Sequence, residues 1–227
     1  MAKPFLIALA LCISLNMYGQ QFMFEKPDYA RIQRDVADSA SKLFYPNLMS
    51  RYLRNDTTLG IEEYRHLYYG YTFQKAYDPF WKSGETDTLQ QLYAKGTFTE
   101  ADCHAIIKYA RKSIEKFPFD LRQIMMLPFA YHTIGDETEA NKWAFKAGSI
   151  TQVIIRSGNG KSPESAWHII LQSHEYDIIR TIGLDGKPLV TPKGNSDYVE
   201  LEENEFKLKG VYFDVGRIFD AVKKKKR

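Results

Sequence analysis

The chain has 227 residues, 44% of them hydrophobic and 14% aromatic, with 31 basic against 28 acidic side chains. That apolar share is ample for a packed core. Five basic residues stand together from Lys223 to Arg227, and without them acidic residues outnumber basic ones, which argues against a nucleic-acid partner.

The first segment predicts export. Lys3 precedes an apolar run from Phe5 to Leu15, and the small residue Gly19 follows, which is the layout of a secretory signal. We expect residues 1–19 to be removed. The run is too short for a bilayer-spanning helix, which needs roughly 20 residues, so we expect a periplasmic or secreted protein without a transmembrane segment. Cys103 is then the single cysteine, and it predicts a buried thiol instead of an intramolecular disulfide.

Helical patterns dominate the next part. Two short helices are expected between residues 27 and 55, where Pro46 restarts the chain. Gly60 is a candidate N-cap for a helix over residues 61–76, which should end before Asp78-Pro79. A short helix is predicted over residues 86–95 and should end at Gly96. A longer one is predicted over residues 99–117, with Thr99 as its N-cap.

An antiparallel helix pair is predicted over residues 119–156, turning at Gly135-Asp136. Counted from Pro118, the small residues Ala130, Ala140 and Ala147 and the aromatic Tyr131 stand at spacings that resemble a tetratricopeptide repeat. In that repeat small side chains let two helices approach closely and an aromatic ring fills the space between them. Pro128 departs from the usual small residue and could kink the first helix.

The periodicity changes after Ser157. Residues 157–160 read as a loop, residues 167–172 as a strand, 175–182 as a short helix, and 185–188 as a turn. Two strands over 197–201 and 207–215 predict an antiparallel hairpin, and a helix is expected over 217–226. Helices followed by strands predict an α+β fold: tetratricopeptide-like hairpins over residues 20–156, then a small antiparallel sheet with a short helix over 157–227, in one compact unit.

Several stretches carry a wider resemblance. Residues 56–59, 63–71, 117–120, 157–160, 174–176 and 210–215 are similar to an exported family of Gram-negative bacteria described as domain of unknown function 4919. The resemblance implies an exported domain of helices followed by a small sheet. It implies no activity, substrate or catalytic residue.

The sequence contains no specific catalytic or metal motif, and we expect no cofactor. His174, Glu175 and Asp214 are the candidates for acid–base chemistry, and His174 and Asp177 could share a helical face as metal ligands, although no zinc-type spacing is present. For each of these residues, a buried hydrogen bond or a helix cap is the favoured interpretation. The candidate aromatic residues for ligand binding are Tyr69, Trp81 and Tyr131.

Three functions follow as hypotheses. The first is a non-enzymatic module of the cell envelope that recognises a peptide or protein on the surface of its helical hairpins. The second is a hydrolase of envelope polymers or polysaccharides, which requires His174, Glu175 and Asp214 to converge within about 5 Å in a pocket. The third is a carbohydrate-binding protein that uses Trp81 and neighbouring Tyr residues.

Overall fold

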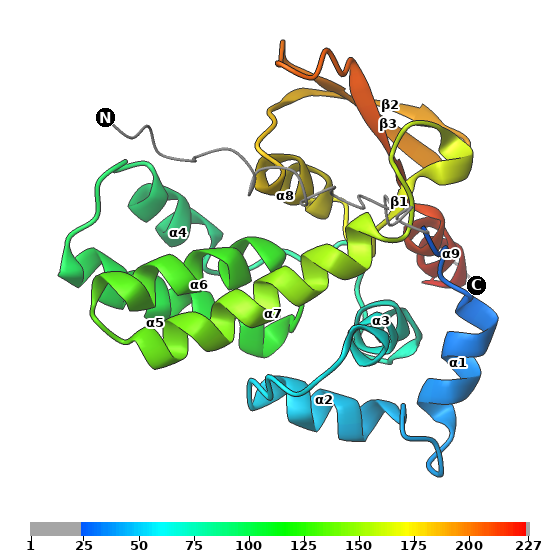
Figure 1. The fold of residues 1–227 in the computed structure, drawn as a ribbon, viewed down its shortest axis with the longest axis horizontal. Coiled ribbons are helices and arrows are strands. Elements are labelled where there is room, and N and C mark those ends of the chain that lie inside the picture. Colours follow the sequence, from blue (N-terminus) through cyan, green and yellow to red (C-terminus); the bar gives the residue numbers. More distant parts are fainter. Residues whose placement is uncertain (1–23, 226–227) are drawn as a thin grey trace, which may run out of the picture.

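The structure, a computed structural model, describes residues 24–225 (Figure 1), so the predicted signal peptide over residues 1–19 lies outside the described residues. Helices come first and strands follow, which confirms the α+β class. The helical part contains α1 (Tyr29–Ala37), α2 (Tyr45–Leu53), α3 (Ile61–Gly70), η1 (Tyr71–Phe73), α4 (Thr86–Tyr93), α5 (Glu100–Lys116), α6 (Leu121–Thr133) and α7 (Glu137–Ile155). The second part contains η2 (Pro163–Ser165), β1 (Trp167–His168), α8 (His174–Thr181), β2 (Gly186–Lys193), β3 (Ser196–Leu201), β4 (Gly210–Asp214) and α9 (Gly216–Lys225).

Local caps explain where several helices begin. At α5 the hydroxyl of Thr99 accepts a hydrogen bond from the amide of Asp102, and the Asp102 carboxylate accepts one from the amide of Thr99. At α3 the amide of Gly60 donates to the Glu63 carboxylate at 2.7 Å. The side chain of Asp136 caps α7. These contacts satisfy amides that have no partner inside the helix.

Helix α3 ends at Gly70, earlier than the predicted residue 76, and continues as the 3₁₀ turn η1. A Cβ atom at position 70 would stand 2.9 Å from a methyl of Val36 and 3.4 Å from the ring of Tyr45, so α1 and α2 pack directly on this glycine. The Thr72 hydroxyl donates to the carbonyl of Tyr69 at 2.7 Å, which supports the tighter turn.

The predicted helix pair is present as α6 and α7. The turn between them uses Gly135 at φ +80°, in the left-handed region that glycine occupies readily. Ala130, Ala140 and Ala147 are all buried, and α6 continues through Pro128. The resemblance of this pair to a tetratricopeptide repeat stays a prediction.

The sheet is mixed and has the strand order β1-β4-β3-β2. Strands β3 and β4 form the predicted antiparallel hairpin, whereas β1 pairs in parallel with β4, so the sheet is not wholly antiparallel. Strand β1 is limited to Trp167 and His168, shorter than the predicted strand. The turn predicted over 185–188 is wrong, because Gly186–Lys193 forms the edge strand β2.

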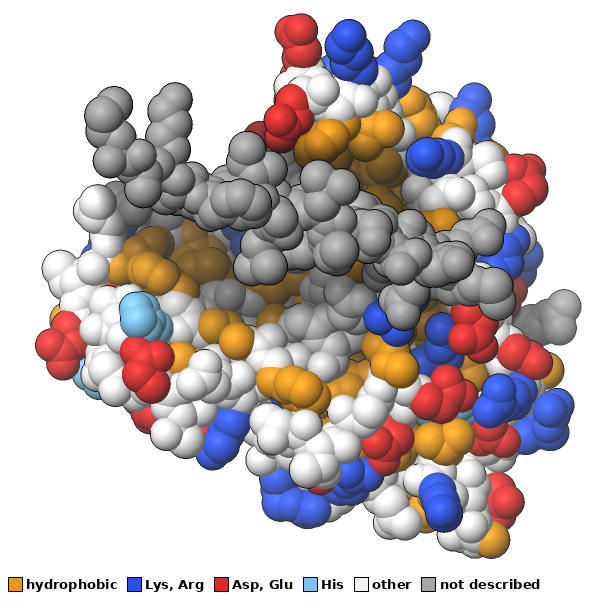
Figure 2. Space-filling model, in the orientation of Figure 1, with side chains coloured by type: hydrophobic (Ala, Val, Ile, Leu, Met, Phe, Trp, Pro, Cys, Tyr) orange, Lys and Arg blue, Asp and Glu red, His pale blue; other side chains and the backbone are white. Residues whose placement is uncertain are grey.

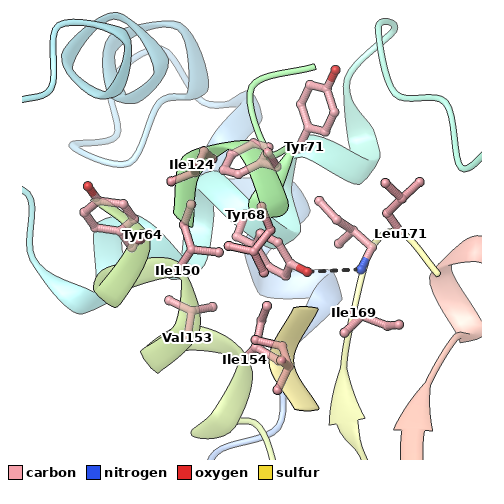
Figure 3. Packing of buried hydrophobic residues seen from close by; sticks show 14 of the residues in the cluster. Tyr64, Tyr68, Tyr71, Ile124, Ile150, Val153, Ile154, Ile169 and Leu171 are labelled. Atoms are coloured by element: carbon pink, nitrogen blue, oxygen red, sulfur yellow. Dashed lines mark hydrogen bonds between the residues drawn. The ribbon is translucent and has the colours of Figure 1, made fainter. Parts of the chain in front are cut away.

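One hydrophobic cluster runs through both parts of the chain. It joins residues of α3, α6 and α7 to residues of the 167–171 segment and the sheet, with Phe119 and Tyr68 fully buried at its centre. Figure 3 shows the Tyr68 hydroxyl pointing at the backbone of the segment that carries Ile169 and Leu171, where it accepts a hydrogen bond from the Ile170 amide at 3.4 Å. The helical part and the sheet therefore share a core. Over residues 24–225 no helix combines the length and apolarity that a bilayer crossing requires.

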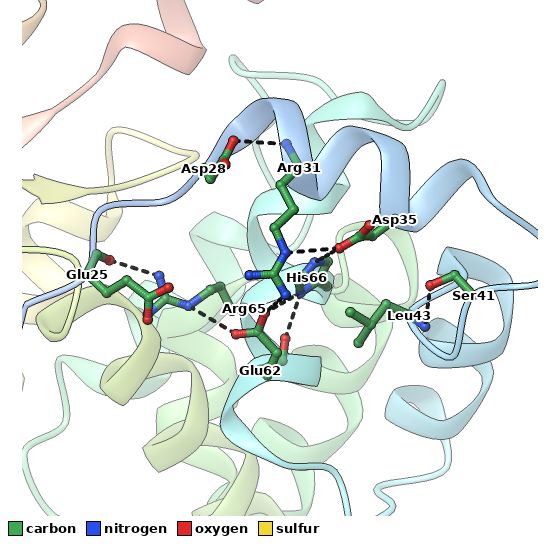
Figure 4. Close-up of polar contacts among 9 residues, drawn as sticks. All are labelled: Glu25, Asp28, Arg31, Asp35, Ser41, Leu43, Glu62, Arg65 and His66. Atoms are coloured by element: carbon green, nitrogen blue, oxygen red, sulfur yellow. Dashed lines mark hydrogen bonds and ion pairs between the residues drawn. The ribbon is translucent and has the colours of Figure 1, made fainter.

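A polar network attaches the start of the described chain to α3 (Figure 4). Arg65 is 6% exposed, and it donates to the Glu25 carbonyl at 2.8 Å while pairing with the Glu25 carboxylate at 3.2 Å. Its neighbour His66 contacts the carboxylate of Asp35 on α1 at 3.1 Å. Figure 2 shows acidic and basic side chains interspersed over this part of the surface, where Arg31 pairs with Glu62. These contacts fix α1 across α3.

The loop before β1 tolerates no side chain at Gly158. A Cβ atom there would stand 2.3 Å from the Ser165 carbonyl oxygen and 2.4 Å from that of Ala166. We expect Gly158→Ala to lower the free energy of unfolding by about 2 kcal/mol or more, because backbone must move to relieve the clash. Urea denaturation measures this. Gly148→Ala in α7 is the control: its Cβ meets nothing within 4 Å, so the change should stabilise slightly, and equal effects would contradict the packing argument.

Candidate functional site

Two adjoining cavities lie between α6 and α8. One has a volume of about 530 Å³ and is bordered by the segment 81–86, α6 and α8; the other, of about 460 Å³, is bordered by α4, residue 98, α6 and α8. Arg122, Asp177 and Arg180 line both. We call the two cavities together the α6–α8 groove. Figure 1 shows α8 and α4 on the same side of α6.

Helical spacing places the charged residues of the groove. Asp177 lies in the first turn of α8, so Arg180 and Thr181, three and four residues later, share its face. Helix α6 begins directly after Asp120, which puts Arg122 and Met125 on the opposite wall. The remaining positions of α8, including Ile178 and Ile179, are buried in the core.

Asp177 is 6% exposed, and among the described residues its carboxylate has no hydrogen bond or ion pair. Burial, followed by the charge of Asp120, raises the pKa of Asp177 to about 7, while Arg122 and Arg180 act in the opposite direction. Burial also raises the pKa of Asp120, which is 8% exposed and accepts a hydrogen bond from Ser113 at 2.5 Å. The two carboxyls are thus held in a poorly solvated position where each prefers its proton more than usual.

The walls around these charges are fixed by packing. The indole of Trp81 stacks on the ring of Phe117 with centroids 4.7 Å apart and an interplanar angle of 16°. The Tyr93 hydroxyl donates to Gln123 at 2.5 Å, and the guanidinium of Arg122 lies 5.7 Å from the Tyr93 ring centre. Each end of the groove is largely apolar, with Trp81, Leu171 and Tyr176 at one end and Tyr93, Phe98, Met125 and Met126 at the other.

This arrangement can orient a bound ligand. A ligand would meet a charged centre between two apolar ends, a pattern that fixes orientation through a few polar groups. The hydroxyl of Ser83, in the lining, lies 2.8 Å from that of Ser113, and Ser113 in turn contacts the Asp120 carboxyl, so a second hydroxyl separates Ser83 from Asp120. Within the described part of the chain, no three His, Cys, Asp or Glu side chains group closely enough to hold a metal ion.

His174 lies in the core and not in the groove. It has no exposed surface; its Nε2 lies 2.9 Å from the Phe119 carbonyl oxygen and its Nδ1 lies 2.7 Å from the Tyr68 hydroxyl. The carbonyl can only accept, so Nε2 carries the proton and the Tyr68 hydroxyl donates to Nδ1. Burial lowers the pKa of His174 to about 4, against the hydrogen bond to Phe119. The histidine therefore stays neutral and joins α8 to α3 and to the start of α6.

Glu175 is also fully buried, on the other side of α8. None of the described N–H or O–H groups donates to either of its oxygens, so its ionised form would be unsatisfied. Burial, followed by the charge of Asp197 on β3, raises the pKa of Glu175 to about 9. Protonated Glu175 can donate to Asp197, which accepts a second hydrogen bond from Gln172 at 3.2 Å. The pair links α8 to the sheet.

Asp214 belongs to a third group, at the end of β4, where it pairs with Ser196 of β3 and His168 of β1. Its carboxylate accepts a hydrogen bond from the Gly216 amide at 3.0 Å and lies 3.6 Å from Nδ1 of His168. The hydroxyl of Tyr29 on α1 is 3.3 Å from the same nitrogen, and the Arg217 guanidinium lies 5.1 Å from the Tyr29 ring centre. His174, Glu175 and Asp214 thus have separate partners, and the structure does not bring them into one pocket.

The predicted aromatics also separate. Tyr69 is fully buried and its hydroxyl lies 3.3 Å from the carbonyls of Val153 and His168. Tyr131 is 5% exposed on α6, with Arg111 at 3.4 Å from its hydroxyl. Trp81 lines the groove together with Asp177, which was predicted only as a metal-ligand candidate. Asp120, Arg122 and Arg180 were missed, although the 177, 180, 181 spacing on a predicted helix could have indicated the face of α8.

Fold and groove together define an α+β domain in which a helical layer and a small mixed sheet share one core and a charged groove opens between α6 and α8. The sequence model of the family described as domain of unknown function 4919 matches residues 30–224, and the chain belongs to that family. The comparison with curated proteins gave no significant match. The search of solved structures gave none either.

Proposed function

We propose that the protein is a non-catalytic binding module of the cell envelope, exported by the segment 1–19, and that its α6–α8 groove takes an extended segment of a peptide or protein. The observation that carries the proposal is the form of the groove: two cavities joined at Arg122, Asp177 and Arg180, with apolar walls at both ends. An extended chain can place a side chain in each cavity and its polar backbone at the centre.

The helical hairpin supports this proposal. In a tetratricopeptide unit the first helix of the pair lines the binding surface, and here α6 supplies Arg122, Gln123, Met125 and Met126 to the groove. Methionine side chains adapt to ligands of different shape, which suits recognition of varied sequences. The buried alanines of α6 and α7 agree with such a unit.

Filling one cavity tests the proposal. Thr181 is exposed at the end of α8 and lines the smaller cavity, so Thr181→Arg should occupy it. We expect the affinity for a pool of amidated random hexapeptides, measured by fluorescence polarisation, to fall about tenfold or more. Thr138→Arg, the same substitution at an exposed position on α7, is the matched control. Absence of peptide binding to the unaltered protein, or equal affinity of both variants and the unaltered protein, would contradict the proposal.

Carbohydrate binding is the second candidate, and Trp81 favours it. Its indole is held flat by Phe117 at the edge of the larger cavity, and a fixed aromatic face is the usual platform for a sugar ring. This candidate predicts that the unaltered protein binds an oligosaccharide and does not bind the peptide pool. It also predicts that Trp81→Ala abolishes oligosaccharide binding. The hydrolase alternative has no such support, because His174 and Glu175 have no exposed surface.

A further inference from the structure

Asp177 is the charged group of the groove that is best placed to bind a ligand. It stands where the two cavities meet, it is 6% exposed, and none of the described residues gives its carboxylate a hydrogen bond or an ion pair. The Asp177 oxygens are not among the described side-chain atoms that are sealed from solvent without a partner, so they open onto the groove, where a ligand can reach them. A hydrogen-bond donor is the partner that such a carboxylate takes, and a positively charged donor would interact most strongly.

The charged residues around Asp177 indicate which class of ligand the groove can bind. Asp120, directly before α6, lines the same cavity and acts on the charge of Asp177. Arg122, Arg180 and Lys82 are exposed around the groove, and the described part of the chain gives none of these three an ion pair. The groove thus offers carboxyl oxygens that can accept a hydrogen bond and, beside them, basic groups that can donate one. A ligand that presents a cation and, close beside it, an oxygen that can accept from arginine uses both kinds of group.

The N-terminal residue of a peptide has this pattern. Its ammonium group offers three N–H donors, and its own carbonyl oxygen follows one carbon further along the chain. The ammonium of a lysine side chain is separated from the nearest carbonyl by its whole aliphatic stem, so it brings no such acceptor. Resting on the proposed function, we infer that the groove recognises the free N-terminus of a peptide, with the ammonium on Asp177 and the first carbonyls on Arg122 and Arg180.

The affinity of the groove for a free peptide N-terminus should then decrease at low pH and also at high pH. Burial and Asp120 raise the pKa of Asp177 to about 7, and the ammonium binds only the ionised carboxylate, so affinity should fall as pH drops below 7. An α-amino group has a pKa of about 8, so affinity should also fall above that value. A lysine side chain would keep its charge to about pH 10. Of the other titratable groups lining the groove, Tyr93 and Tyr176 have pKa values raised by burial and stay neutral in this range, while Lys82 and the two arginines are basic.

Two pools of amidated hexapeptides test the inference, one with free N-termini and one N-acetylated. We expect acetylation to weaken binding to the unaltered protein about tenfold or more, and Asp177→Asn to remove the difference between the pools. The Asn side chain has the same shape and no buried charge, and a melting curve checks that the variant folds. Equal affinity for both pools in the unaltered protein overturns the inference alone. Absence of binding by both pools overturns the proposed function and the inference with it.

Discussion

His174→Ala should lower the free energy of unfolding by about 4 kcal/mol at pH 7. The change removes a fully buried ring and leaves the Tyr68 hydroxyl of α3 and the carbonyl of Phe119, which precedes α6, without the partner that they share. Urea denaturation followed by circular dichroism measures the loss. His104→Ala is the matched control: this histidine is exposed on α5, 3.7 Å from Glu100, and its removal should change stability by less than about 0.5 kcal/mol.

The free energies of unfolding of the unaltered protein and of His174→Ala, measured as a function of pH, give a second test. The folded pKa of His174 is lowered from 6.5 to about 4, so the unfolded chain binds more protons between these values. Its contribution to stability is therefore complete above pH 6.5 and is lost as pH falls toward 4, by about 3 kcal/mol in all. The difference between His174→Ala and the unaltered protein should narrow over this range. A difference that stays constant from pH 7 to pH 4 would contradict a neutral, buried histidine.

Glu175→Gln should stabilise the protein in alkaline solution. The folded pKa of Glu175 is raised from 4.5 to about 9, so the folded protein holds a proton that the unfolded chain has released. Stability is therefore lost as pH rises from 4.5 toward 9. A glutamine mimics the protonated acid and donates to Asp197 at every pH, so at pH 8 the variant should exceed the unaltered protein by about 2 kcal/mol or more.

The advantage of Glu175→Gln should disappear near pH 4, where Glu175 is protonated in both states. Thermal denaturation at pH 4, 6 and 8 measures this dependence. Glu115→Gln, on the exposed face of α5, controls for the loss of one negative charge and should behave alike at all three values. If Glu175→Gln is less stable than the unaltered protein at pH 8, Glu175 is ionised in the folded state and the carboxyl pair is described incorrectly.

Helix positions could be predicted because their signals are local. Thr99 and Asp102 form their capping contacts within four residues, and Gly135 needs only its own freedom at positive φ to turn the chain. The early end of α3 could not be predicted in the same way. It depends on Val36 and Tyr45 packing against Gly70, and no pattern within α3 reveals that approach.

Strand β2 was missed because it lies at the edge of the sheet. Pro188 and Pro192 are tolerated there, where some backbone amides have no neighbouring strand, and its residues show no buried and exposed alternation. The prediction of one strand over residues 167–172 was too long, because continuous burial was interpreted as strand pairing. Ile169 and Ile170 are both fully buried, as in a central strand, but only Trp167 and His168 pair with β4.

The groove was beyond the reach of sequence patterns, since its lining comes from segments around residues 81, 122 and 177 that no common periodicity relates. Trp81 and Asp177 were both singled out, but for different reasons and never together. His174 and Glu175 were predicted together as candidates for acid–base chemistry, but they are neighbours on a helix and contact different partners. Residue type alone does not distinguish an acid that lines a cavity from one that holds a sheet to a helix.

The contacts around His168 join the two ends of the described chain. The hydroxyl of Tyr29 reaches across 139 residues to His168, and Arg217 donates to Thr72 across 145. These contacts can form only after β4 and α9 have been synthesised, and contacts of such long sequence separation form slowly. Until then, the sides of α1 and η1 that carry Tyr29 and Thr72 lack the partners that the end of the chain supplies.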